Sequence, residues 1–291
     1  MGTRDIRRRI KSVRNTSLIT KAMQMVATSK MAQAQAQALQ GRAFAAQLGK
    51  ILRDIGRHAL EVEHPLWRGA ADGAPPAVLL ISTDKGLCGG LNANLFRVLA
   101  ALPAETVLVT IGRRGRQFAA RTKRRLLADF PLPERIAYPA VKHIAEYLSE
   151  AFLRGEIGSL TVLYPRFVNT LVQKPLREPL LPLADLNCSN VGLLGETVLS
   201  ADHDTGADFV YEPSASAVRD KLFPMYVNFN LYHMLLEARA SEHSARMVAM
   251  KNATDNARQL TKDLTLEYNK VRQTAITNEI LEIAAAQAAG D

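Results

Sequence analysis

Apolar residues near the C-terminus recur every three or four positions, which places them in one stripe on an α-helix. The stripe consists of Met250, Ala253, Ala257, Leu260, Leu264, Tyr268, Val271 and Ala275. The N-terminal part carries a second alanine-rich stripe, made of Ile19, Ala22, Val26, Ser29, Ala32, Ala36, Leu39, Ala43 and Ala46. Small side chains let two helices pack closely, as in a coiled coil. The pattern therefore predicts an antiparallel helix pair whose seam contains Met250, Ala253, Ala257, Leu260, Leu264 and Val271; two separate bundle helices would leave a similar pattern.

The distribution of helix breakers supports two long terminal helices. All 13 prolines lie between Pro65 and Pro224, and residues 225–289 contain neither proline nor glycine. One helix over that stretch would be roughly 98 Å long. A compact middle part of about 160 residues has a radius of gyration of roughly 15 Å. Such a helix must protrude from the middle part, and its exposed length requires a partner.

The middle of the chain alternates between strand and helix patterns. Strands are expected at residues 77–82, 106–111, 160–164, 167–173 and 209–212, and helices at 89–102 and 141–153. We interpret residues 175–182 as a proline-rich connection and residues 197–206 as a loop. Ser214 is expected to cap a short helix, and Pro224 is expected to begin the long C-terminal helix. The predicted fold is a long antiparallel coiled coil with an inserted Rossmann-like α/β domain. The expected domains are a discontinuous shaft, residues 1–64 plus 224–291, and an α/β foot, residues 65–223.

Positive charge is concentrated at the N-terminus. The net charge is +9, and residues 1–30 hold eight basic side chains against the single acid Asp5. A solvated basic face, a nucleic-acid arm and a transit peptide all fit this cluster. We favour a basic collar that faces an acidic protein surface. No apolar run is long enough to span a bilayer, no export signal is evident, and two cysteines make no disulfide framework, so we expect a reducing setting without bilayer insertion.

Motifs for catalysis are weak. The glycine-rich segment 84–92 has the spacing G-x-x-G-G, which is neither the dinucleotide fingerprint nor the P-loop, so we expect a structural turn there. Cys88 has no histidine nearby in the sequence, and a small buried residue is expected. Asp202, Asp204 and Asp208 lack the glycine and glutamate of a calcium loop. The histidines show no metal-binding spacing. We expect no catalytic residue, no metal and no cofactor in this chain.

Three segments of the chain carry specific motifs. The first is IRRRIKSVRNT at residues 6–16, continued by ITKAMQMVA at 19–27. The second is STDKGLCGGLN at 82–92. The third is ASEHSARMVAMKNATDNA at 240–257, continued by YNKVRQTAIT at 268–277. Together they resemble the gamma subunits of F-type ATP synthases. The pair Ser17-Leu18 departs from the Gln-Lys common in the family and removes one positive charge from the collar.

The resemblance implies a rotor shaft that does not itself catalyse. Its coiled coil would penetrate a hexamer of alpha and beta subunits, and its foot would sit on the membrane c ring beside the epsilon subunit. Ion flow would turn the ring, and the shaft would drive ATP synthesis in the beta subunits. The chain would then be a peripheral membrane protein on the cytoplasmic face of a bacterial inner membrane, with no nucleic-acid partner.

Residue roles are implied by position in the family. The collar residues Lys11, Arg14, Lys21 and Lys30 would face acidic loops of beta, and Arg272 and Gln273 would bond to the catalytic hexamer. Ile276, Ile280, Leu281 and Ile283 would form a tip in an apolar bearing. Tyr211 and Glu212 would meet the c ring. Two other hypotheses stay open: a basic coiled-coil protein that binds nucleic acid, and a nucleotide-dependent enzyme built on the α/β insert.

Overall fold

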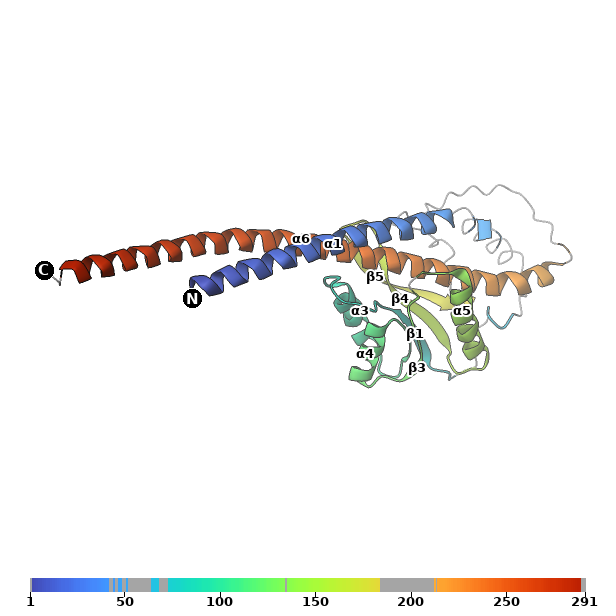
Figure 1. Ribbon diagram of the computed structural model, residues 1–291. Coiled ribbons are helices and arrows are strands. Elements are labelled where there is room, and N and C mark those ends of the chain that lie inside the picture. Colours follow the sequence, from blue (N-terminus) through green and yellow to red (C-terminus); the bar gives the residue numbers. More distant parts are fainter. Residues whose placement is uncertain are drawn as a thin grey trace. The chain divides into compact units, whose positions relative to one another are not determined.

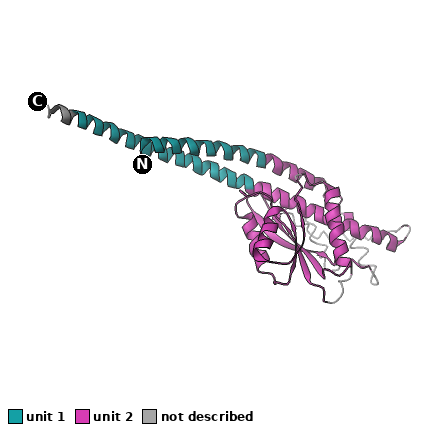
Figure 2. Cartoon of the chain, turned by 60° about the horizontal axis from the view of Figure 1, so that its bottom comes forward, with its two compact units in different colours: residues 1–27, 246–291 teal, residues 28–245 magenta. Residues whose placement is uncertain are grey.

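The computed structural model describes residues 2–41, 44, 47–48, 51, 64–67, 73–133, 135–183, 212 and 214–288. Two compact units make up the chain (Figure 2). Unit 1 combines residues 1–27 with 246–291, and unit 2 spans residues 28–245. The sequence suggested a division after residues 64 and 223. The compact units divide the chain after 27 and 245 instead, because parts of both long helices pack with the α/β sheet.

Two long helices contribute to both units. Helix α1 spans Thr3–Gln40 and helix α6 spans Ala215–Ala288, which is 74 residues or roughly 110 Å of helix. The hydroxyl of Ser214 accepts a hydrogen bond from the backbone N–H of Ala217, so the expected cap is present. The expectation that Pro224 opens the long helix is wrong, because α6 continues through Pro224 without a break. The neighbouring side chains Phe223 and Tyr226 are buried, and their packing offsets the hydrogen bond that proline removes.

In unit 1, α1 and α6 pair antiparallel with a regular spacing of contact positions. The buried or half-buried positions of α1 include Ile6, Ile10, Val13, Ser17, Thr20, Gln24 and Ala27. Those of α6 include Met250, Thr254, Ala257, Thr261, Leu264, Tyr268 and Val271. Both series alternate steps of four and three, the seven-residue repeat of a coiled coil. Two hydrogen bonds fix the direction, since Thr20 bonds to Thr254 and Arg7 bonds to Tyr268.

The predicted stripe on α1 is wrong. Ile19, Val26 and Leu39 are 60%, 56% and 48% exposed, and the described alanines and serine of that stripe are exposed as well. Ala43 and Ala46 lie outside the described residues. The inward positions are instead small or polar, as at Ser17, Thr20 and Ala27. A prediction from hydrophobicity alone therefore chose the face of α1 next to the one that is buried.

The predicted seam on α6 needs one correction. Met250, Ala257 and Leu264 are buried, and Ala253 and Val271 are half-buried. Leu260 is 40% exposed, and the half-buried neighbour Thr261 takes its place. Thr254 and Thr261 each donate a 2.8 Å hydrogen bond to the carbonyl four residues earlier. Because those hydroxyls are satisfied within the helix, the threonine methyl groups can pack in the seam.

Unit 2 contains a five-stranded sheet in the order β3-β2-β1-β4-β5. Its strands are β1 Pro76–Ile81, β2 Val107–Ile111, β3 Leu126–Phe130, β4 Ser159–Phe167 and β5 Gln173–Leu181. The pairs formed by β1 to β4 are parallel, and β5 pairs antiparallel with β4. This order is that of a doubly wound, Rossmann-like sheet with an antiparallel edge. The predicted fold class is therefore confirmed.

Helices cover both faces of this sheet (Figure 1). Helices α3, Leu91–Ala100, and α4, Arg113–Thr122, pack on the face that carries Val78, Leu80 and Leu108. Helix α5, Tyr138–Leu153, packs on the opposite face together with α6 residues between 223 and 238. Alternate residues of β1 therefore enter different cores.

Some predicted elements of the middle region are displaced. Residues 168–172 form the turn between β4 and β5, so the strand expected at 167–173 is absent there. The stretch interpreted as a proline-rich connection is strand β5. Its prolines at 175 and 179 are tolerated because β5 is an edge strand. Strand β3 and helix α4 were not predicted, and the expected loop at 197–206 and strand residues 209–211 lie outside the described residues.

Candidate partner-binding surfaces

The ligand crevice typical of doubly wound sheets is filled by α6. In such sheets ligands bind beyond the carboxyl ends of the strands where the strand order reverses, here between β1 and β4. The loops that leave these two strands are 82–90 and 168–172. Ala245 of α6 packs against Cys88 and Leu91 of the first loop and helix. Ser244 of α6 donates a 2.7 Å hydrogen bond to the carbonyl of Thr170 in the second. A helix from the same chain therefore occupies the position that a nucleotide would take.

The glycine-rich loop uses its polar groups for its own turn. The side chain of Asn92 donates a 2.7 Å hydrogen bond to the hydroxyl of Thr83, which donates in turn to the carbonyl of Lys85. Leu87 and Gly89 have φ angles of 62° and 60°, the left-handed region where glycine is the least strained residue. The loop buries Cys88 and exposes 61% of Leu87. This geometry is that of a tight turn which displays one apolar side chain.

A buried section of α6 contains several polar side chains. Residues 237–245 are buried apart from the half-buried Arg239. Arg239 donates hydrogen bonds of 2.9 Å to Glu242 and 2.8 Å to the carbonyl of Pro133. On another side, Ala240 packs against Ala34 of α1 and Phe167 of β4. The segment ASEHSA at 240–245 therefore anchors α6 within unit 2, through the packing of Ala240 and Ala245 and the hydrogen bond from Ser244 to Thr170.

The outer face of α1 in unit 1 combines basic and apolar side chains. Lys11, Arg14 and Lys21 are exposed, and helical spacing places Leu18 and Met25 in the same row. Leu18 and Met25 are 71% and 58% exposed. Lys30, the fourth expected collar residue, is exposed in unit 2. A surface of this composition fits an acidic partner with apolar contacts.

Helix α6 extends beyond its partner in unit 1 (Figure 1). Arg7 bonds to Tyr268, and α1 begins only four residues before Arg7, so the paired region ends near residue 272. The remaining residues of α6 form roughly 24 Å of single helix. Arg272 and Gln273 are exposed at its base. Ile276, Ile280, Leu281 and Ile283 are between 46% and 62% exposed, so this end presents a row of apolar side chains.

The expected foot contact is only partly visible. Glu212 is exposed, and Tyr211 lies outside the described residues.

Buried ionisable groups in unit 2 belong to its core. The hydroxyl of Tyr164 on β4 donates a 3.0 Å hydrogen bond to Glu178 on β5, and burial raises the pKa of both groups. Burial lowers the pKa of His233 on α6 to about 4. The His233 ring packs against Phe229 with ring centroids 4.4 Å apart. These groups are held in apolar packing and have no shared reaction centre among the described residues.

The residues that the structure describes contain no group of three or more histidine, cysteine, aspartate or glutamate side chains placed to hold a metal ion. Within the same residues, no helix combines the length and the apolar character needed to cross a bilayer.

Sequence reasoning missed the polar members of the helix seam. The stripes leave out Thr20 and Thr254 because threonine is not counted as apolar, and they include Tyr268 but not its hydrogen-bond partner Arg7. The threonines could have been found from the spacing of the seam positions, which alternates between four and three residues along each helix. The apolar residues alone follow this spacing less regularly.

Comparison with known proteins gives a consistent result over the whole chain. A family model described as ATP synthase matches residues 2–289. The ATP synthase gamma chain of Opitutus terrae is 48% identical over 288 residues, covering 98% of each chain. That of Akkermansia muciniphila is 44% identical with the same coverage. A chain in the cryo-EM structure of the Euglena gracilis mitochondrial ATP synthase, in its OSCP/F1/c-ring part, matches the fold with a TM-score of 0.68 at 17% identity, over 99% of this chain and 94% of that one.

Proposed function

Because the chain belongs to the family of ATP synthase gamma chains, we propose that it is the central rotor shaft of a rotary ATP synthase. The observation that carries the proposal is the antiparallel pair of α1 and α6 in unit 1, from which α6 extends as a single helix with an exposed apolar end. An elongated shaft of this kind can be enclosed by a ring of subunits. The nucleic-acid and nucleotide-enzyme hypotheses have no support among the relatives named above.

The shaft would couple two other parts of the complex. Its paired helices lie within the hexamer of alpha and beta subunits, and its foot sits on the membrane c ring next to the epsilon subunit. Ion flow turns the ring and the shaft, and ATP is made in the beta subunits, so this chain does not catalyse. It would be held peripherally at the cytoplasmic face of a bacterial inner membrane. The filling of the Rossmann crevice by α6 supports a mechanical role for the α/β insert.

Helix α6 is suited to pass torque between the two compact units. It is one helix from Ala215 to Ala288 and belongs to both units. In unit 2 it is anchored through Arg239 and Ser244 to the segments around Pro133 and Thr170. Torque applied to the foot therefore acts on a buried, hydrogen-bonded section of the same helix that forms the shaft.

The exposed surfaces of the shaft have the chemistry that sliding contact needs. Lys11, Arg14, Lys21 and Lys30 attract acidic loops of beta, and exposed ion pairs are individually weak, at roughly 0–1 kcal/mol. Arg272 and Gln273 bond to the catalytic hexamer at the base of the tip. Ile276, Ile280, Leu281 and Ile283 turn in an apolar bearing, where contact is non-directional. Tyr211 and Glu212 meet the c ring.

Reconstitution with alpha and beta subunits tests the proposal. We expect the full-length chain to form a hexamer-containing complex with ATPase activity and observable rotation. Ile280→Asp introduces a charge into the apolar bearing and should reduce rotation and coupling. Asn278→Asp is the matched control, because Asn278 is already polar and lies on the side of the helix opposite Ile276, Ile280 and Ile283. If no ATPase-active complex that contains this chain forms, the rotor function is wrong.

A further inference from the structure

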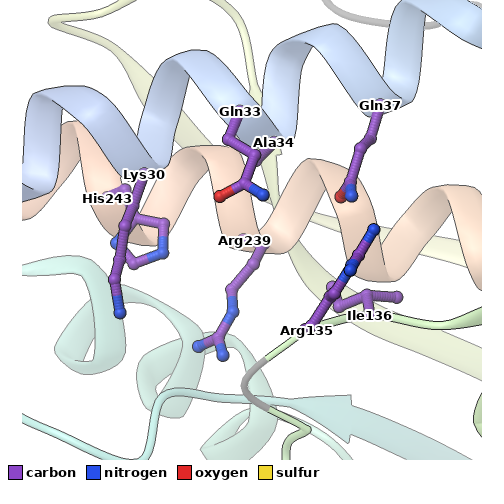
Figure 3. A pocket seen from close by; sticks show the side chains of 8 residues that line it. All are labelled: Lys30, Gln33, Ala34, Gln37, Arg135, Ile136, Arg239 and His243. Carbon is purple, nitrogen blue, oxygen red and sulfur yellow. The ribbon is translucent and has the colours of Figure 1, made fainter.

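A cavity of about 170 Å³ lies in unit 2 where α1, the segment before α5 and α6 meet. Figure 3 shows the eight side chains that line it. They are Lys30, Gln33, Ala34 and Gln37 from α1, Arg135 and Ile136 from the segment before α5, and Arg239 and His243 from α6. The lining thus comes from three parts of the chain that are far apart in the sequence.

The polar lining consists of cationic side chains, carboxamides and the imidazole of His243. The cationic side chains are Lys30, Arg135 and Arg239, and Gln33 and Gln37 each bring an amide group that can donate two hydrogen bonds. None of these eight lining residues is an aspartate or a glutamate. Glu242 pairs with Arg239 from outside the lining, and the cationic side chains that face the cavity would attract an anion within it.

The guanidinium of Arg239 is a hydrogen-bond donor whose position at the cavity is held by other groups. Its side chain is 14% exposed, and it is held by hydrogen bonds to Glu242 and to the carbonyl of Pro133. Glu242 is not part of the lining, and its ion pair holds the Arg239 guanidinium in place. Lys30 and Arg135 are exposed residues at the rim. A half-buried, oriented guanidinium with two exposed cationic residues at the entrance is a suitable arrangement for binding an anion from solvent.

The size of the cavity restricts the ligand. A cavity needs about 10–15 Å³ to hold one water molecule. The volume here therefore has room for a small tetrahedral anion with some of its water. Arginine binds phosphate oxygens in a bidentate manner, and lysine binds them as a point charge.

We propose that this cavity is a binding site for an oxyanion of the phosphate class. Arg239 and Arg135 bind its oxygens from two sides, Gln33 and Gln37 donate amide hydrogens, and Lys30 balances the remaining charge at the rim. The oxyanion is inorganic phosphate or the phosphate end of a nucleotide such as ADP, since both present the same group. The site does not depend on the rotor function.

Calorimetric titration of the full-length chain tests the site. Inorganic phosphate and ADP are titrated separately at constant ionic strength, with chloride as the reference anion. We expect a saturable one-to-one heat with phosphate that chloride does not give. Tighter binding of ADP than of phosphate identifies a nucleotide as the source, and binding of phosphate alone identifies the free ion. If neither binds, the proposal is overturned.

Two charge-matched variants distinguish the cavity from general basicity. A hydrogen bond to a charged group contributes about 1.5–3 kcal/mol, so Arg135→Gln should weaken binding roughly tenfold or more. Arg125→Gln removes the same charge from an exposed position outside the cavity and should leave the affinity nearly unchanged. Equal losses in both variants would refute a specific site. The proposal also fails if phosphate does not bind and Arg135→Gln instead weakens assembly with alpha and beta subunits, because the cavity would then receive a carboxylate of a partner.

Discussion

The hydroxyl oxygens of Thr20 and Thr254 lie 2.7 Å apart in the seam between α1 and α6. Both side chains are buried, and the Thr254 hydroxyl also donates to the carbonyl of Met250. The Thr20 hydroxyl has a similar acceptor, the carbonyl of Ser17 at 3.1 Å, so either hydroxyl can be the donor in the pair. This pair joins residues 234 positions apart and marks the register of the two helices.

Removing one hydroxyl of this pair should cost more than removing both. Thr254→Val takes away the hydrogen-bond partner of Thr20 across the seam and should destabilise the helix pair by about 0.5–1.5 kcal/mol, because the Thr20 hydroxyl keeps the carbonyl of Ser17. Thr20→Val with Thr254→Val replaces both groups by methyl groups of similar shape, which is close to neutral. Thermal unfolding followed by circular dichroism measures the single and double variants. Additive losses would show that the two hydroxyls are not coupled.

The burial of two leucines of α6 distinguishes the observed seam from the seam expected from hydrophobicity. Leu264 is 5% exposed and Leu260 is 40% exposed. Leu264→Ala should cost about 2–5 kcal/mol, the usual range for a buried leucine. Leu260→Ala is the matched control and should cost much less, because its side chain keeps much of its contact with solvent. Denaturant unfolding of both variants decides between the two faces, and similar losses would place Leu260 in the seam.

Gly41 at the end of α1 leaves room for His233. A Cβ atom at position 41 would lie 2.6 Å from Cε1 of His233, whose ring is packed against Phe229 and Tyr232. Gly41→Ala should therefore destabilise unit 2 by about 1–3 kcal/mol through overpacking. Gly90→Ala serves as the control, since its nearest neighbour would be 3.9 Å away at an ordinary φ of −84°. A harmless Gly41→Ala together with a harmless Gly90→Ala would contradict the close packing of His233.

Protonation of His233 should make the fold sensitive to acid. Burial lowers its pKa from 6.5 to about 4, so between these pH values the unfolded chain binds a proton that the folded chain does not. The free energy of unfolding should therefore fall as the pH is lowered from 6.5 towards 4, by up to about 3 kcal/mol from this group. Neither ring nitrogen has a hydrogen-bond partner among the described residues, so His233→Leu should remove this dependence. Unfolding measured at several pH values gives both slopes.

Titration of Glu178 changes the free energy of unfolding in the opposite direction to titration of His233, so the two contributions must be measured separately. Burial raises its pKa, so the folded chain binds a proton on Glu178 before the unfolded chain does, and this favours folding as the pH falls. Glu178→Gln removes that contribution and should steepen the loss of stability in acid. The same slope in the parent protein and in His233→Leu would contradict the assignment to His233.

The α/β insert shows where local patterns succeed and fail. Strands β1, β2 and β4 are apolar runs buried on both faces, so their sequences already indicate their structure. Strand β5 contains two prolines and becomes a strand only because β4 offers it an edge. Helix α4 is dominated by arginine, and only Gly115, Phe118 and Ala119 of this helix are buried, so its pattern is too weak to recognise.

The sequence by itself determined that both ends are long helices, because they lack prolines and carry an alanine-rich repeat, and its motifs determined the family. The tertiary structure decided which face of each helix is buried. Ile19 and Leu260 are more apolar than Thr20 and Thr261, yet the threonines face the seam because close packing selects small side chains whose hydroxyls bond to the backbone or to each other. The structure alone also decided that α6 fills the crevice of the sheet, since the contacts of Ala245 with Cys88 and Leu91 join segments that no local pattern connects.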